Sequence, residues 1–200
     1  MQSKCLRCIK IYFHINFNTL TNSYLVVNED TKQALIIDPC TVSKELINQI
    51  EDGGYTLSAT LITHKHTSHI SALSTIRKIY DIKVYGADPE AAGQINVLQG
   101  DGRIRVAGLD IDYFSIPGHS SDSIAYKVGT VLFTGDVIFA GKIGSSSCNY
   151  TKTRLCNGIK TKIFSLPEET VIMPGHGPLT SVGAEMQFNL DVGEKNSFGG

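Results

Sequence analysis

The feature that most constrains this chain is a repeated arrangement in which metal-ligating residue types directly follow apolar, strand-like runs. Five of the six histidines and one aspartate occupy such positions, after "TLIT", "DYFSIPG", "TVLFTG" and "TVIMPG". They are His64, His66, His69, His119, Asp136 and His176. Strand ends on one edge of a sheet converge in space, so side chains placed there can meet at one point. Imidazole and carboxylate groups suit zinc, iron and related divalent ions, and the arrangement therefore predicts a metal site.

The pattern of secondary structure is mixed. Alternating and β-branched runs predict strands at 9–16, 22–28, 33–38, 57–63, 82–86, 103–106, 109–116, 123–128, 130–134 and 169–173. Helical spacing of apolar residues predicts helices at 42–52, 68–80, 153–165 and 181–190. Many strands with interspersed helices favour layered α/β or α+β packing. We expect one domain over residues 1–190 and a flexible tail over 191–200.

Composition narrows the class of function. The chain of 200 residues is 42% hydrophobic and 18% charged with a net charge of −1, which gives no basic field for binding nucleic acid. No apolar run approaches the ~18 residues that span a bilayer, and the N-terminal segment lacks the core of a signal peptide. Five cysteines, an odd number, argue against a disulfide framework. These features predict a cytoplasmic protein without a nucleic-acid or membrane partner, and they leave its oligomeric state open.

Four short motifs in order resemble those of the metallo-β-lactamase superfamily: "THKHTSH", "PGHS", "TGD" and "PGHG". More narrowly, the chain is similar to hydroxyacylglutathione hydrolases (glyoxalase II) and their short relatives. Further matching stretches include "NSYLVV", "ALIIDP" and "LFTGDVIFAGKIG", so the resemblance covers roughly residues 10 to 190. It implies an αββα sandwich, in which two facing β-sheets are flanked by helices and the metal lies in the groove at the sheet edges.

The resemblance also implies roles for the six residues. His64, His66 and His119 resemble the histidines of a first metal site, and Asp136 resembles the carboxylate that bridges two metals. His69 and His176 resemble ligands of a second site. The implied cofactor is zinc, as one or two ions, with iron or manganese as alternatives. In such enzymes a metal-bound hydroxide, held here by His64, His66, His119 and Asp136, attacks a thioester, ester or amide carbonyl.

One position departs from the motif. Members of the family carry an aspartate in an HxHxDH pattern, whereas this chain has Ser68. A neutral hydroxyl is a poor zinc ligand and no useful base at neutral pH, so we expect the second site to be weaker than the first. Two residues are candidates to replace the missing ligand: Cys40, which follows "IIDP", and Asp122, which closely follows His119. Asp38, in "IIDP", is a candidate acceptor that orients a ligating imidazole.

Three hypotheses for function follow. The first is a metal-dependent hydrolase whose small-molecule substrate is a thioester or ester, such as an acyl-thiol. The second is a binding or regulatory protein that keeps one metal and has lost catalysis because of Ser68. The third is a mononuclear iron enzyme similar to the persulfide dioxygenases that share the fold, since two histidines and a carboxylate suit non-haem iron. Lys142 and Arg154 are candidate contacts for an anionic substrate, or solvated surface charges.

Overall fold

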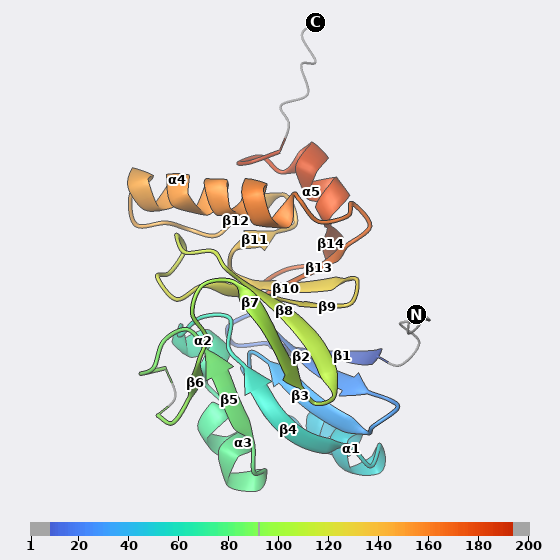
Figure 1. Ribbon diagram of the computed structural model, residues 1–200. Coiled ribbons are helices and arrows are strands. Elements are labelled where there is room, and N and C mark those ends of the chain that lie inside the picture. The colour runs from blue at the N-terminus through green and yellow to red at the C-terminus, as the bar shows by residue number, and fades with distance from the viewer. Residues whose placement is uncertain (1–8, 92, 194–200) are drawn as a thin grey trace, which may run out of the picture.

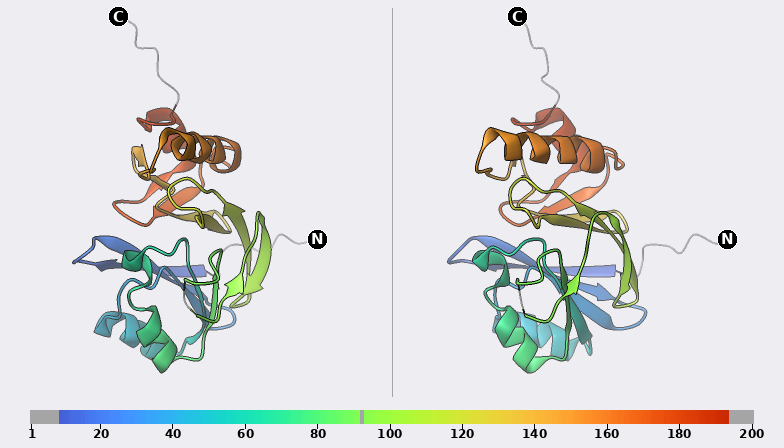
Figure 2. Two further views of the ribbon diagram at one scale, coloured as in Figure 1. Left: turned by 90° about the vertical axis from the view of Figure 1, so that its left-hand side faces the viewer. Right: turned by 60° about the vertical axis from the view of Figure 1, so that its left-hand side comes forward.

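The computed structural model describes residues 9–91 and 93–193. Two six-stranded sheets face each other, and helices cover the outer side of each sheet (Figures 1 and 2). This four-layer arrangement confirms the predicted αββα class. No helix in the described ranges is long and apolar enough to cross a membrane.

The first sheet is built by the N-terminal half of the chain. Its strands run in chain order across the sheet: β1 (Ile9–Asn16), β2 (Thr21–Asn28), β3 (Gln33–Ile37), β4 (Thr56–Leu61), β5 (Lys83–Gly86) and β6 (Asn96–Val97). The first three strands pair antiparallel, and β3 to β6 pair parallel. The parallel strands therefore end at one edge, where the histidine-rich stretch after β4 begins.

The second sheet is built by the C-terminal half, in the order β14-β13-β10-β9-β8-β7. Its strands are β7 (Gly102–Val106), β8 (Leu109–Ser115), β9 (Ile124–Val128), β10 (Val131–Gly135), β13 (Val171–Pro174) and β14 (Thr180–Ser181). Strands β10 and β13 pair parallel, so the residues that follow them emerge side by side. A small hairpin of β11 (Ile138–Phe139) and β12 (Lys142–Ile143) follows β10.

Helices cover both outer faces of the sandwich. On the first sheet lie α1 (Lys44–Asp52) and α3 (Leu73–Ile79), with the short α2 (Thr67–Ile70) near the edge (Figure 1). On the second lie α4 (Asn149–Gly158), a π-helical turn (Ile159–Ile163) and α5 (Val182–Phe188). Helix α1 begins where the Ser43 side chain accepts a hydrogen bond from the backbone of Leu46, and it ends before Gly53.

Strand β2 explains why the layers stack in this order. All eight of its residues are buried, because the strand is covered on both faces. Tyr24 and Val26 pack into the core between the two sheets, whereas Leu25 and Val27 pack against the helices of the first sheet. A third buried cluster, which includes Leu132 of β10, fills the space between the second sheet and its helices.

The predicted helix at 68–80 is two helices rather than one. The Ser71 hydroxyl donates to the carbonyl of Cys40, and the Ala72 amide donates to the carbonyl of Pro39. These bonds tie the chain to the end of β3 and separate α2 from α3. Apolar spacing alone continues through the break, so the sequence pattern gave no sign of it.

The predicted helix at 153–165 begins and ends earlier than expected. It starts at Asn149, because Cys148 and Thr151 form a reciprocal capping box, and it passes into a π-helical turn after Gly158. The two-residue strands β6, β11, β12 and β14 were not predicted, since a pair of residues is too short to show alternation.

The expected tail begins at residue 191, but its first residues contact the domain. Lys152 donates to the carboxylate of Asp191, and Val192 is buried in the core beneath the second sheet. Residues 194–200 of that tail lie outside the described residues.

A core substitution tests the packing between the sheets. Phe133 is fully buried on β10 and packs against Tyr24 of β2, so Phe133→Ala should lower the free energy of unfolding by about 3–5 kcal/mol. Phe188 is 63% exposed on α5, and Phe188→Ala should change the same quantity by less than about 0.5 kcal/mol. Urea denaturation followed by circular dichroism measures both, and equal losses would contradict the layer assignment.

Candidate metal centre

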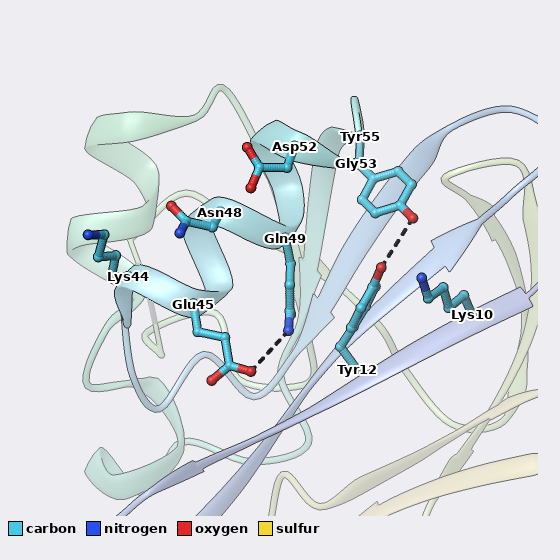
Figure 3. Close-up of a pocket in the computed structure, with 9 residues that line it drawn as sticks. All are labelled: Lys10, Tyr12, Lys44, Glu45, Asn48, Gln49, Asp52, Gly53 and Tyr55. Carbon is cyan, nitrogen blue, oxygen red and sulfur yellow. Dashed lines mark hydrogen bonds between the residues drawn. The ribbon is translucent and has the colours of Figure 1, made fainter.

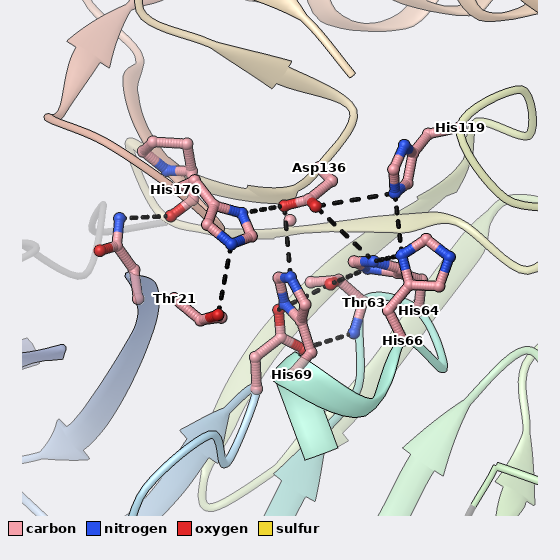
Figure 4. Close-up of polar contacts among 12 residues, drawn as sticks. Thr21, Thr63, His64, His66, His69, His119, Asp136 and His176 are labelled. Atoms are coloured by element: carbon pink, nitrogen blue, oxygen red, sulfur yellow. Dashed lines mark hydrogen bonds and ion pairs between the residues drawn. The ribbon is translucent and has the colours of Figure 1, made fainter. Parts of the chain in front are cut away.

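The structure brings all six predicted residues together (Figure 4). The first sheet contributes three of them from one short stretch after β4, and the second sheet contributes one from each of three strand ends. The former are His64, His66 and His69, and the latter are His119 after β8, Asp136 after β10 and His176 after β13. His69 is carried by the short helix α2, which turns its ring back toward the strand ends.

Four of the residues form a first group of candidate ligand atoms. His66 Nδ1 lies 2.9 Å from His64 Nε2 and 3.1 Å from His119 Nε2. Asp136 Oδ2 lies 3.9 Å from His64 Nε2 and 3.6 Å from His119 Nε2. All four atoms fall within 4.8 Å of one another. Nitrogen atoms that share one tetrahedral zinc lie about 3.3 Å apart, so this spacing suits a single ion.

Asp136 also belongs to a second group. Its other oxygen, Oδ1, lies 2.9 Å from His176 Nδ1 and 3.3 Å from His69 Nε2. The Nε2 atom of His69 is buried and has no well-aligned hydrogen-bond partner in the described part of the chain. A buried nitrogen without a partner lowers the stability of the fold unless another group binds it, and a divalent cation would do so. The donor set therefore fits a metal on each side of the Asp136 carboxylate.

A buried carboxylate outside these groups orients two of the rings. Asp38 Oδ2 accepts from His69 Nδ1 at 2.8 Å and from the Thr63 hydroxyl at 2.6 Å. The Thr63 oxygen in turn lies 3.1 Å from His64 Nδ1 and can accept its proton. These contacts leave the Nε2 atoms of both His64 and His69 facing Asp136 (Figure 4). Asp38 thus lies where an orienting acceptor was expected.

Other contacts orient the remaining rings. His119 Nδ1 donates to the backbone carbonyl of Ser145 at 2.9 Å, which turns Nε2 toward the first group. His176 Nε2 lies 3.2 Å from the Thr21 hydroxyl, so its Nδ1 faces Asp136. Sequence reasoning missed Thr21, Thr63 and the Ser145 carbonyl. The position of Thr63 directly before His64 was a usable signal, but a contact through a backbone carbonyl leaves no trace in residue type.

A glycine allows the strand ends to approach this closely. Gly135 precedes Asp136 and has a φ of +51°. A Cβ atom there would clash with the side chain of Thr63. The glycine of "TGD" is therefore required both by its backbone conformation and by contact with the other sheet.

Burial and neighbouring charges set the protonation of the cluster. Burial, reinforced by the nearby imidazoles, lowers the pKa of His64 to about 2, so its ring is neutral and able to donate an electron pair. Burial also opposes a charge on His69, but the carboxylates of Asp38 and Asp136 outweigh it and raise the pKa of His69 to about 10. For Asp136, burial favours the neutral acid, but the hydrogen bond from His176 and the nearby His69 ring outweigh burial and hold its pKa well below the usual range. An incoming cation must therefore displace a proton from His69.

The residues considered as substitutes for the missing aspartate lie elsewhere. Cys40 is buried, its thiol donates to the Thr21 carbonyl, and burial raises its pKa to about 12. Asp122 accepts from the backbone of Lys65 and from the hydroxyl of Ser120. Neither belongs to the groups of converging ligand atoms, and Ser68 is half-buried on α2. The second group thus has three candidate ligands, against four in the first.

An open depression in the surface lies away from the six clustered residues. It has a volume of about 620 Å³ between α1 and β1, and Tyr12, Tyr55 and Lys10 are among its lining residues (Figure 3). It is open, and both acidic and basic side chains line it. None of the six clustered residues lines it, so the candidate chemistry is placed by the histidines rather than by cavity size.

Comparison with known sequences agrees with this geometry. The model of the metallo-β-lactamase superfamily matches residues 18–114. A probable metallo-hydrolase of Bacillus subtilis is 31% identical, with 84% of this chain and 90% of the relative covered. A hydroxyacylglutathione hydrolase of Haemophilus influenzae is 28% identical, with 84% of this chain and 91% of the relative covered.

Solved structures share the fold. The B3 metallo-β-lactamase BLEG-1 matches with a TM-score of 0.81 and 31% identity, over 92% of this chain and 99% of its own. ETHE1 of Myxococcus xanthus matches with a TM-score of 0.83 and 28% identity, over 92% and 84% of the two chains. The protein TTHA1623, solved in a di-iron-bound form, matches with a TM-score of 0.75 and 25% identity, over 90% and 98%.

The role of Thr63 is open to a direct test. Thr63→Val removes the hydroxyl that links His64 to Asp38 and should weaken metal binding about 10- to 100-fold, because the His64 ring loses its fixed orientation. Thr63→Ser keeps the hydroxyl and should bind metal within a few-fold of the unmodified chain. Competition with a chromogenic chelator measures the affinities. Equal affinities for the valine and serine variants would show that the hydroxyl does not orient the ring.

Proposed function

The chain belongs to the metallo-β-lactamase superfamily, and from this membership we propose that it is a metal-dependent hydrolase of thioesters or esters. One observation carries the proposal: two groups of candidate ligand atoms converge on opposite oxygens of Asp136. The similarity to a hydroxyacylglutathione hydrolase supports an acyl-thiol as the substrate. Zinc is the first choice of metal by ligand type, and the similarity to a protein solved with two irons supports iron as the alternative.

The first group is proposed as the principal site. His64, His66 and His119 supply ring nitrogen atoms, and Asp136 supplies a carboxylate oxygen. A divalent metal bound there would lower the pKa of a coordinated water toward neutrality and polarise the carbonyl of the substrate. His66 is exposed and His119 half-buried, whereas His64 is buried. Access from solvent is therefore on the side of His66 and His119, and a substrate would approach from there.

The chain's own groups hold this site in place. Asp38 and Thr63 fix the ring of His64 from beneath, and the Ser145 carbonyl fixes that of His119. Because the rings are already oriented, little further side-chain entropy is lost when their nitrogen atoms bind a metal. On the second side, His69 and His176 are held in the same manner, but Ser68 supplies no charge. We therefore propose that the second side binds metal more weakly than the first.

A second candidate function is an iron-dependent dioxygenase of small persulfides. It is favoured by the second group, in which His69, His176 and Asp136 are two histidines and one carboxylate, the set typical of non-haem iron oxygenases. Oxygen uptake by the ferrous-loaded protein with glutathione persulfide distinguishes it from the hydrolase. Uptake without any thioester cleavage would replace the first proposal.

Hydrolysis is tested with a pair of histidine variants. The zinc-loaded protein should cleave acyl-thiols, and His119→Gln should lower the rate by more than about 100-fold because a ligand of the principal site is lost. His14 is bonded to Gln49 and lies outside the cluster, so His14→Gln should retain the activity. Release of free thiol, followed with a thiol-reactive dye, measures the rates. Failure of the metal-loaded protein on a broad panel of thioesters and esters would favour a binding protein that has lost catalysis.

Metal stoichiometry tests the role of Ser68. The unmodified chain should hold close to one metal per chain after dialysis, and Ser68→Asp should raise this ratio toward two by adding a negative ligand. Ser68→Asn has nearly the same shape without the charge and should stay near one. Elemental analysis measures all three proteins. A ratio near two in the unmodified chain would show that the serine is tolerated.

A further inference from the structure

A small pocket adjoins the candidate metal centre on the side of His119. It has a volume of about 230 Å³ and lies between the loop 117–121 and the first turns of α4. We call it the Arg154 pocket; His119, Ser121, Ser147, Thr151 and Arg154 contribute to its lining. His119 therefore takes part in two sites, since its Nε2 atom also faces the first group of ligand atoms. A molecule held in this pocket is in contact with a residue of the proposed reaction centre.

The chemistry of the Arg154 pocket suits an anion. No acidic residue of the described ranges lines it. Asp122, the acid closest in sequence to the loop, is buried, and its oxygens are bonded to the Lys65 amide and the Ser120 hydroxyl. Within residues 9–91 and 93–193, Arg154 makes no ion pair, in contrast to Arg103 and Arg105 of β7. A guanidinium without a carboxylate partner in a pocket free of acids provides a site for anionic oxygen atoms.

The exposed side chains of Arg154 and Tyr150 contact each other, and this contact orients the guanidinium. Arg154 lies one helical turn after Tyr150, and its guanidinium carbon is 5.9 Å from the centre of that ring. Such a cation–π contact lowers the freedom of a long side chain. The hydroxyls of Ser121 and Ser147 add donors from the other walls of the pocket. The volume accommodates one carboxylate or phosphate with its linking atoms and is smaller than a site for a whole drug-sized molecule.

We propose that the Arg154 pocket holds the anionic group, carboxylate or phosphate, of an acyl-thiol whose carbonyl lies at the histidine cluster. This inference rests on the proposed hydrolase function and adds to it the class of substrate. A substrate that spans both sites carries its acidic group beside His119 and places the carbonyl toward His66 and Asp136. A neutral thioester lacks the group that the pocket recognises, so it should bind more weakly than a charged one.

Binding of unreactive probes tests the pocket without relying on turnover. Isothermal calorimetry on the zinc-loaded protein uses an S-alkyl glutathione, an S-alkyl coenzyme A and a neutral S-alkyl N-acetylcysteamine. Arg154→Gln should weaken binding of the matching anionic probe by about tenfold, the scale of one charge-assisted hydrogen bond at a partly exposed site. Loss confined to the glutathione probe identifies a carboxylate, and loss confined to the coenzyme A probe identifies a phosphate. Binding of the neutral probe should not change.

A matched control is Arg105→Gln, since Arg105 is exposed on β7 and lies outside the Arg154 pocket. It should leave the binding of all three probes unchanged. Unaltered binding of both anionic probes by Arg154→Gln, or an equal loss in the Arg105 variant, would overturn the inference. Binding that depends on Arg154 without cleavage of any thioester would support the pocket and remove the hydrolase proposal. Thioester cleavage at a rate that depends neither on Arg154 nor on the charge of the substrate would support the hydrolase proposal and remove the pocket.

Discussion

The architecture of the site depends on the buried carboxylate of Asp38. Only 2% of this residue is exposed, and its side chain accepts from the amide and hydroxyl of Thr63 and from the ring of His69. A buried carboxylate is stable only when its oxygens are satisfied, so Asp38 requires the end of β3, the end of β4 and helix α2 to meet. The same bonds orient His64 and His69 toward the second sheet. The contacts that stabilise the buried charge of Asp38 are therefore the same contacts that orient the rings of His64 and His69.

Periodicity in the sequence predicted layered α/β or α+β packing, and the resemblance of its motifs to a known family predicted the αββα sandwich. The meeting of the six residues was predicted from their positions at strand ends. His119, Asp136 and His176 each follow an apolar run, and parallel pairing of β10 with β13 brings two of those ends together. The break between α2 and α3 was not predictable, since it is set by bonds from Ser71 and Ala72 to a distant loop. Contacts of rings with the Ser145 carbonyl and the Thr21 hydroxyl were hidden for the same reason. Local pattern carries no information on which backbone group a remote turn presents.

Within the part of the chain that the structure describes, no side chain replaces the carboxylate that Ser68 lacks. Cys40 is committed to the Thr21 carbonyl, and Asp122 is committed to the loop that carries Lys65. Both side chains satisfy backbone groups, and redirecting either one would leave a buried donor or acceptor unpaired. The surrounding structure therefore fixes the asymmetry between the two groups. Asp136 supplies the only negative charge that the two groups of candidate ligands contain.

The larger group of candidate ligands and the Arg154 pocket lie on the same side of Asp136. On the side of His119 are the larger group of candidate ligands, the exposed ring of His66 and the Arg154 pocket. On the side of His176 are the smaller group and the Thr21 hydroxyl. In the proposed binding mode, a substrate anchored by an anionic group at Arg154 would be held beside the group with four candidate ligands. In the proposed hydrolase, positioning and metal chemistry would then act on the same side of Asp136. A weak second side would be compatible with hydrolysis, and catalysis would depend on the metal held by His64, His66, His119 and Asp136.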